Sequence, residues 1–343
     1  MLERLAHPIV QAPMAGGAST PALAAAVSEA GGLGFLAAGY KTAAAMRAEI
    51  TETRALTSRP FGVNVFMPAA DPVDEAAVAA YRERLGPEAR RLGVEPGTPP
   101  ADRSDGWDAK IADLLADPPA VVSFTFGCPG ADTVRAFRDR GAFVVVTVTT
   151  PREAVTAATA GAGALCVQGV EAGGHQGTFG NTGDLGEGRE LRALLPAVRT
   201  LTTLPLIAAG GLATAADVTE VLGLGAAAAQ LGTAFLRCPE SGASAAHKAA
   251  LADPRHTRTA LTRSFSGRPA RGLVNRFMEE YERYAPAAYP DVHFVTSPLR
   301  RAAAARGDLD AVALWAGTSF RLAGDAPAAE IVAGLAGVSA GRG

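Results

Sequence analysis

The sequence has few cysteines and almost no net charge, and both shortages exclude whole classes of protein. Its 343 residues include three cysteines, Cys128, Cys166 and Cys238, which are too few and too scattered for a disulfide framework or a zinc site. The formal net charge is −2, so the chain as a whole does not attract nucleic acid or an anionic membrane. We therefore expect neither as a partner.

Targeting and membrane signals are also missing. The N-terminus lacks the basic region and apolar region of a secretory signal. The longest uncharged stretches are interrupted by glycine and polar residues, and none matches a spanning helix. These features predict a cytoplasmic protein, and 48% hydrophobic residues are enough for a large core.

Short apolar runs alternate with helix-like segments along the first two-thirds of the chain. Unbroken apolar runs are typical of parallel strands that are covered on both faces. Eight strand–helix units in one chain predict an α/β fold of the TIM (β/α)8 barrel type, with a doubly wound open sheet as the alternative. The eight predicted strands are Ile9–Ala12, Leu33–Ala37, Gly62–Phe66, Val121–Phe126, Phe143–Val148, Ala164–Gln168, Leu204–Ala208 and Ala226–Leu231.

Two stretches interrupt this pattern. Residues 67–119 are rich in proline and charge, with one amphipathic helix, and read as an insertion after the third strand. Residues 239–307 follow the eighth strand and read as a small, mainly helical subdomain that could cover the substrate as a lid. The barrel would then consist of residues 1–238 and 308–343, with two helices in the final segment, one of which closes the barrel.

The active site of a TIM barrel lies at the carboxyl ends of its strands. Asn64, Gln168 and Gln230 lie at three of these ends, and a neutral amide can both donate and accept hydrogen bonds. A ring with alternating carbonyl and N–H groups, such as a flavin, needs this property. No carboxylate stands at the strand ends considered, which argues against a metal site and against a glycosidase with paired carboxylates.

Glycines follow the seventh and eighth predicted strands, as Gly210-Gly211 and Gly232-Thr233. Barrels often bind a phosphate with the loops after these two strands, because backbone N–H groups there can approach the oxygens closely. A tight turn is the alternative for either glycine pair alone. The two loops together favour a phosphate site.

The sixth strand runs into a glycine loop with a single histidine, Glu171-Ala172-Gly173-Gly174-His175. Glycine lets the backbone approach a ligand, and histidine can move a proton near neutral pH. The remaining histidines are weaker candidates. His293 is the second choice, and His247 and His256 are expected at the surface.

Several of these segments together resemble the nitronate monooxygenase family, formerly called 2-nitropropane dioxygenases. The matching motifs are Gln11 to Gly17, Gly31 to Gly34, Gly62-Val63-Asn64, Gln168 to Gly177, Ala208 to Gly211, Gln230 to Thr233 and Trp315-Ala316-Gly317. The resemblance implies an FMN-containing TIM barrel that oxidises alkyl nitronates, such as propionate-3-nitronate, with molecular oxygen. The products would be a carbonyl compound and nitrite.

The resemblance also assigns roles. His175 would be the catalytic base, and Ser266, Tyr289 and Trp315 would lie near the substrate. The family often has a lysine there too, but no lysine follows Lys248 in this chain. The residues expected to bind FMN are Ala12, Met14, Asn64, Gln168, Gly173, Gly174, Gly210, Gly211, Gln230, Leu231, Gly232 and Thr233.

Two other functions stay open at this stage. The Glu-Ala-Gly-Gly-His loop also occurs in flavin-dependent enoyl-ACP reductases and quinone reductases that use NAD(P)H. A flavin- or phosphate-binding barrel without catalytic activity is the third reading. In each case the expected ligands are small molecules. For the nitronate monooxygenase reading they are a nitronate or nitroalkane and O2. A homodimer is compatible with the chain.

Overall fold

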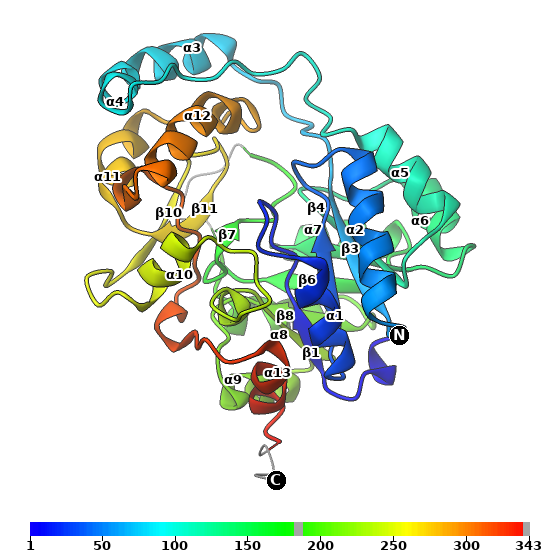
Figure 1. Cartoon of the computed structure of the whole chain (residues 1–343). Coiled ribbons are helices and arrows are strands. Elements are labelled where there is room, and N and C mark those ends of the chain that lie inside the picture. Colours follow the sequence, from blue (N-terminus) through cyan, green and yellow to red (C-terminus); the bar gives the residue numbers. More distant parts are fainter. Residues whose placement is uncertain (182–187, 339–343) are drawn as a thin grey trace.

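A computed structural model describes residues 1–181 and 188–338, so the last five residues of the predicted 308–343 segment lie outside it. Eight parallel strands form one sheet in the order β1-β9-β8-β6-β5-β4-β3-β2. Leu33 closes this sheet into a barrel, because its N–H donates to Ile9 O (2.9 Å) and its carbonyl accepts from Gln11 N (3.0 Å). The predicted TIM barrel is therefore confirmed (Figure 1). Its strands are β1 (Ile9–Gln11), β2 (Gly34–Ala37), β3 (Phe61–Phe66), β4 (Val121–Thr125), β5 (Phe143–Val148), β6 (Ala164–Gln168), β8 (Leu206–Ala209) and β9 (Ala228–Leu231).

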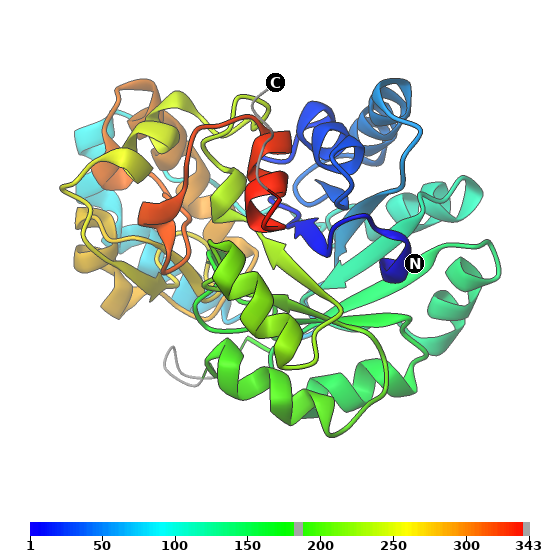
Figure 2. The ribbon, with the colours of Figure 1, turned by 90° about the horizontal axis from the view of Figure 1, so that it is seen from below.

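One α-helix per strand forms the outer layer (Figure 2). These helices are α1 (Pro21–Glu29), α2 (Ala43–Leu56), α5 (Trp107–Ala116), α6 (Ala131–Arg138), α7 (Pro151–Thr159), α8 (Leu191–Arg199), α9 (Ala215–Gly223) and α13 (Ala328–Leu335). Four of them begin after a threonine whose side chain accepts a backbone N–H of the first turn, namely Thr20, Thr42, Thr150 and Thr214. No helix in the described ranges is long and apolar enough to cross a membrane.

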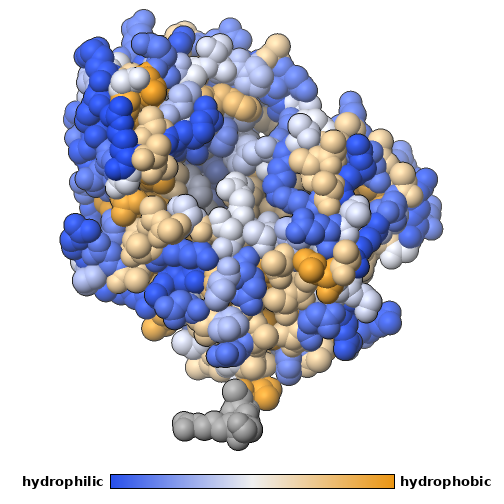
Figure 3. Space-filling view, viewed as in Figure 1, coloured by the Kyte–Doolittle hydropathy of each residue, from blue (hydrophilic) through white to orange (hydrophobic). Residues whose placement is uncertain are grey.

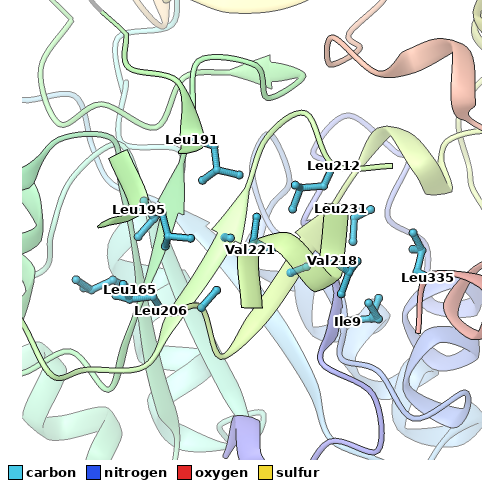
Figure 4. Close-up of a cluster of buried hydrophobic side chains, with 14 of the residues drawn as sticks. Ile9, Leu165, Leu191, Leu195, Leu206, Leu212, Val218, Val221, Leu231 and Leu335 are labelled. Carbon is cyan, nitrogen blue, oxygen red and sulfur yellow. The ribbon is translucent and has the colours of Figure 1, made fainter. Parts of the chain in front are cut away.

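Buried apolar side chains hold the helices on the strands. In Figure 4, Leu191 and Leu195 of α8 and Val221 of α9 lie in one cluster with Leu165 of β6 and Leu206 of β8. Alternate residues of the same strands, including Ala164, Cys166 and Ile207, belong to a second cluster that fills the barrel interior. Both faces of each strand are thus buried, which explains the unbroken apolar runs in the sequence.

Residues 239–307 contain three α-helices and also a β-hairpin that was not predicted. The helices are α10 (Ala245–Ala252), α11 (Arg276–Tyr281) and α12 (Asp291–Ala305), with a 3-10 turn, η3 (Glu282–Tyr284), after α11. The hairpin consists of β10 (Thr259–Thr262) and β11 (Ala270–Leu273), and β11 also pairs antiparallel with β7 (Gly174–His175). This unit therefore reaches across to the histidine loop of the barrel.

The segment 67–119 has two different roles. Its α3 (Glu75–Arg84) and α4 (Gly86–Leu92) pack on α12, far from them in sequence, and lie beside it in Figure 1. The Tyr81 hydroxyl of α3 also donates to Ser264 O at 2.7 Å, which joins α3 to the turn between β10 and β11. The rest of the segment supplies α5, which packs against α2 and β3 as the third barrel helix. The predicted insertion thus includes one regular element of the barrel.

The prediction of two helices between residues 309 and 337 is wrong for the first of them. Only α13 is an α-helix in this stretch; it packs against α1 and α9 and completes the outer ring. The preceding residues form short 3-10 turns, η4 (Leu309–Ala311) and η5 (Phe320–Leu322), around an extended segment. That segment is extended because it pairs with β11, through Leu273 N to Leu314 O (2.8 Å) and Ala316 N to Arg271 O (3.2 Å). Two further 3-10 turns are η1 (Leu2–Arg4) and η2 (Thr233–Phe235).

Candidate functional site

A cavity of about 450 Å³ lies at the carboxyl ends of the barrel strands, against the smaller unit. Figure 3 shows a hollow between the two parts of the molecule. The cavity collects every site residue predicted from the sequence except Tyr289. Tyr289 lies behind the wall, where its hydroxyl donates to the hydroxyl of Tyr40 at 3.1 Å. In the described part of the chain, no group of three His, Cys, Asp or Glu side chains could hold a metal.

One end of the cavity consists of glycine backbone. Gly210 and Gly211 have φ of 115° and 70°, a conformation that side chains with a Cβ rarely adopt. The N–H groups of Gly211, Gly232 and Thr233 have no acceptor among the described residues. The Thr233 hydroxyl accepts from Gly317 N at 3.0 Å and is held beside them. Several unpaired N–H groups around open space are an arrangement that can accept an anionic group such as a phosphate.

The three amides at the strand ends differ in their freedom to bind a ligand. Asn64 donates to the hydroxyls of Ser123 (2.9 Å) and Thr125 (3.0 Å), which leaves its carbonyl oxygen without a described donor. Gln230 is held only through Nε2, which donates to the sulfur of Cys166 at 3.3 Å. Gln168 is different, because Nε2 donates to His175 O (3.2 Å) and Oε1 accepts from Gly177 N (2.7 Å). Gln168 therefore lines the cavity and also anchors the histidine loop.

The His175 loop is fixed from both sides. Gly174 and His175 form β7, opposite Arg271 and Ala270 of β11, so the loop becomes the third strand of a small sheet. Gly173 has no room for a Cβ, which would stand 2.5 Å from Gly317 N. The sequence pattern Gly-Gly-His thus allows close packing at the first glycine and places the imidazole in the cavity.

His175 is held as a neutral imidazole. Its Nε2 lies 2.8 Å from the hydroxyl of Ser266, which also donates to Arg268 O at 3.2 Å. The ring is enclosed by Phe126, Tyr289 and Trp315, with centroids 5.8, 5.7 and 5.5 Å away. Burial, together with the positive charges of Arg268 and Arg300, lowers the pKa of His175 to about 3.

Arg268 supports the same loop but does not line the cavity. Its side chain is buried, and its guanidinium donates to the carbonyl oxygens of Gln176 and Thr178. It also stacks over the ring of Phe126 at 4.1 Å. Without these hydrogen bonds, the backbone of the residues that follow His175 would lose its support, so Arg268 acts as a positioning residue.

Several residues of the cavity were not predicted. Four of them lie at or just after the carboxyl end of a strand: Tyr40, Thr125, Phe126 and Thr147. Inspecting the ends of β2, β4 and β5, as was done for the other strands, could have found them. Tyr40 has φ of 65° and is held by Asp105, whose carboxylate accepts from Tyr40 N at 3.0 Å. Arg300 lines the cavity from α12, and no sequence motif pointed to it.

The prediction that His247 lies at the surface is wrong, because His247 lines the cavity. His293, the second candidate for the functional histidine, lines it too. The first turn of α10 directs His247 inward, where its Nε2 lies 3.1 Å from Trp315 O. Burial lowers the pKa of His247 to about 4. Burial, the charge of Arg300 and neighbouring groups lower the pKa of His293 to about 2.

These three histidines make the fold sensitive to acid. Because their folded-state pKa values lie below the unfolded value of about 6.5, the unfolded chain binds more protons as the pH falls below that value. Each can therefore reduce the free energy of unfolding by at most about 1.4 kcal/mol per pH unit below pH 6.5. Urea unfolding at pH 7.0 and 5.5 should show this loss, and His247→Gln should show a smaller one. Equal losses in both proteins would contradict the assignment.

Comparisons with known proteins agree with this geometry. The family model for nitronate monooxygenase matches residues 1–337. A nitronate monooxygenase from Pseudomonas aeruginosa is 45% identical over 338 residues, which cover 95% of this chain and 94% of that one. The solved structure of a nitroalkane oxidase from Streptomyces ansochromogenes has a TM-score of 0.95 and 54% identity, covering 98% of this chain and 96% of that one.

A more distant likeness extends to another named enzyme. FabK from Thermotoga maritima has a TM-score of 0.75 and 27% identity, covering 97% of this chain and 93% of that chain. The family-model match spans the barrel strands, the histidine loop and the smaller unit alike. The chain therefore belongs to the nitronate monooxygenase family of oxidoreductases.

Proposed function

We propose that this chain is an FMN-dependent enzyme that oxidises alkyl nitronates with molecular oxygen, giving a carbonyl compound and nitrite. The observation that carries the proposal is one cavity with unpaired glycine N–H groups at one end and a neutral imidazole, His175, facing the same space. Family membership supports the nitronate as substrate.

The residues present fit FMN. The N–H groups of Gly211, Gly232 and Thr233 would hold the phosphate, because they lack described acceptors and surround open space. Asn64 and Gln230 each keep a free carbonyl oxygen for a ring N–H group. When bound there, FMN would supply the electron chemistry of the reaction.

The protein's own part is to orient the substrate and to handle its α-proton. With the Ser266 hydroxyl donating to Arg268 O, Nε2 of His175 donates to Ser266 and the lone pair lies on Nδ1. A neutral nitroalkane needs this lone pair as a base, whereas a nitronate has already lost the proton. The low pKa of His175 makes proton removal costly, and so favours preformed nitronates as substrates.

An anaerobic titration followed by flavin absorbance tests the reaction. We expect propionate-3-nitronate and ethylnitronate to reduce the flavin and NADH to leave it oxidised. The second candidate is an NAD(P)H-dependent enoyl or quinone reductase, because the Glu-Ala-Gly-Gly-His loop also resembles those enzymes. Reduction by NADH, with no change on adding either nitronate, would establish that alternative and exclude the proposal.

The identity of the cofactor is a separate prediction. We expect mass spectrometry of the material released from the purified protein to give FMN, because the cavity has one glycine-rich phosphate site and the first strand is not followed by a GxGxxG motif. FAD, or the failure to take up any flavin on reconstitution, would contradict the assignment. Bound FMN without turnover of any tested substrate would leave a non-catalytic flavin-binding barrel.

A further inference from the structure

Arg300 is the one charged residue among the described residues that line the cavity. It lies on α12 and its side chain runs back along the helix. Nη2 donates to His293 O (3.0 Å) and Ser297 Oγ (2.9 Å), and Nε donates to Thr296 Oγ1 (3.2 Å). Nη1 has no acceptor among the described residues.

No carboxylate in the described part of the chain balances this charge. The nearest acid on the same helix, Asp291, is already bound by Arg103 through two hydrogen bonds of 2.6 and 2.8 Å. Burial lowers the pKa of Arg300 to about 10, so the guanidinium is still charged at neutral pH. A partly buried cation without a counter-ion is costly unless a ligand supplies one.

Two further donors stand beside Arg300. Nη2 of Arg300 also lies 3.2 Å from Nδ1 of His293. Because a guanidinium has no acceptor, an N–H group on Nδ1 would face it unfavourably, so the proton of the neutral ring is on Nε2. The His293 ring stacks on Tyr40 at 4.1 Å between centroids. Tyr40 accepts from Tyr289, and burial raises the pKa of Tyr40 to about 12, so its own O–H proton remains to donate. Neither His293 Nε2–H nor Tyr40 O–H has an acceptor among the described residues.

We propose that Arg300, with His293 and Tyr40, binds a planar two-oxygen anion of the substrate and so determines specificity. This rests on the proposed function for the identity of the substrate. The guanidinium fork matches two oxygens held in one plane, a geometry that a nitronate group and a carboxylate share. Gly211, Gly232 and Thr233 form the separate site for the cofactor phosphate, so the Arg300 cluster is free for the substrate.

Binding of an inert anion tests the site without turnover. The FMN-loaded protein is titrated with sodium propionate, and with propionamide as the neutral analogue of the same shape, while the flavin spectrum is recorded. We expect propionate to bind and Arg300→Met to weaken it about 10–10²-fold, the range for a lost hydrogen bond to a charged group. Arg300→Lys should recover part of the affinity, because it keeps the charge without the fork.

The matched control is Arg301→Met, which removes the same charge from the next position of α12, where the side chain is exposed. It should bind propionate like the wild type. Equal propionate affinity in Arg300→Met and the wild type would overturn the proposal. Loss of FMN from Arg300→Met would overturn it too, because Arg300 would then serve the cofactor.

Steady-state kinetics then identify which anion is bound. If Arg300 holds a carboxylate, Arg300→Met raises KM for propionate-3-nitronate and leaves ethylnitronate unchanged. If it holds the nitronate group, Arg300→Met raises KM for both substrates about equally. Either result supports the anion site. Should the wild type oxidise no nitronate while Arg300→Met still loses propionate binding, the proposed function fails and the anion site stands.

Discussion

Replacing His175 with asparagine should lower kcat/KM for neutral nitroethane by about 10²–10⁴-fold, the range that general-base catalysis typically contributes. The same change should lower kcat/KM for ethylnitronate much less. A neutral nitroalkane must lose its α-proton in the active site, whereas the nitronate has already lost it. The prediction applies to the extent that the wild type turns over nitroethane at all.

The structure explains why the loss should be selective. His175 is neutral, is oriented by Ser266, and faces a cavity whose described lining contains no carboxylate that could replace it as a base. Asparagine keeps a polar group of similar reach but cannot accept the α-proton. The anion site at Arg300 would still hold the nitronate in the variant, which limits the loss on that substrate.

The measurement is kcat/KM on both substrates for wild type and variant, with FMN content determined in each. His256→Asn is the matched control, because it makes the same chemical change outside the cavity lining. Equal losses on nitroethane and ethylnitronate would leave His175 as a binding residue only. Unchanged rates on both substrates would show that His175 is not the base and would point to His293, the other candidate within the cavity.

The barrel could be predicted because its signals are local. The strands are short and mostly apolar, and β5 and β6 have the predicted bounds because β5 ends just before a helix that starts after threonine and β6 ends just before a glycine. The hairpin of β10 and β11 gave no such signal, because β10 is mostly half-buried and β11 is buried by its pairing with β10 and β7, which no local pattern specifies. The dual role of 67–119 likewise depends on α12, more than 170 residues away in the chain.

The site was predictable where it follows a strand and hidden where it depends on tertiary contacts. Asn64 lies in the second half of β3, His175 in the loop after β6 and Gly232 directly after β9, so chain position was enough to predict that they share one cavity. Arg300 and His293 reach the cavity because α12 lies across the strand ends, which no local pattern specifies. The second role of Gln168 as an anchor for the loop depends on hydrogen bonds between residues seven and nine positions apart.

The second large effect concerns the glycines of the proposed phosphate site. Gly232→Val should lose FMN while the barrel stays folded. An added Cβ at Gly232 meets Ala12 Cβ at 3.4 Å and Met14 Sδ at 3.6 Å, which is ordinary contact, so the backbone can keep its shape. The extra methyl groups of valine would instead occupy the cavity next to the N–H groups of Gly232 and Thr233.

Gly210→Val should lose FMN for an additional reason. Its φ of 115° is unfavourable for any residue with a Cβ, and the new atom would lie 3.1 Å from both Ala172 N and Gly169 O. The loop itself should therefore shift, and the melting temperature should fall in this variant more than in Gly232→Val. Gly223→Val, where the added Cβ meets nothing within 4 Å, is the control for the substitution as such.

The size of the effect follows from the hydrogen bonds that valine blocks at Gly232. A hydrogen bond to a charged group is worth about 1.5–3 kcal/mol, so the loss of two such bonds to a phosphate corresponds to about 10²–10⁴-fold in the Kd for FMN. Titration of the apoprotein with FMN, followed by fluorescence quenching, measures this Kd, and circular dichroism checks the fold. Full FMN occupancy in both Gly210→Val and Gly232→Val would mean that the phosphate binds elsewhere. Loss of FMN together with loss of the fold in Gly232→Val would show instead that this glycine supports the barrel, because a pure binding role predicts an intact circular dichroism spectrum.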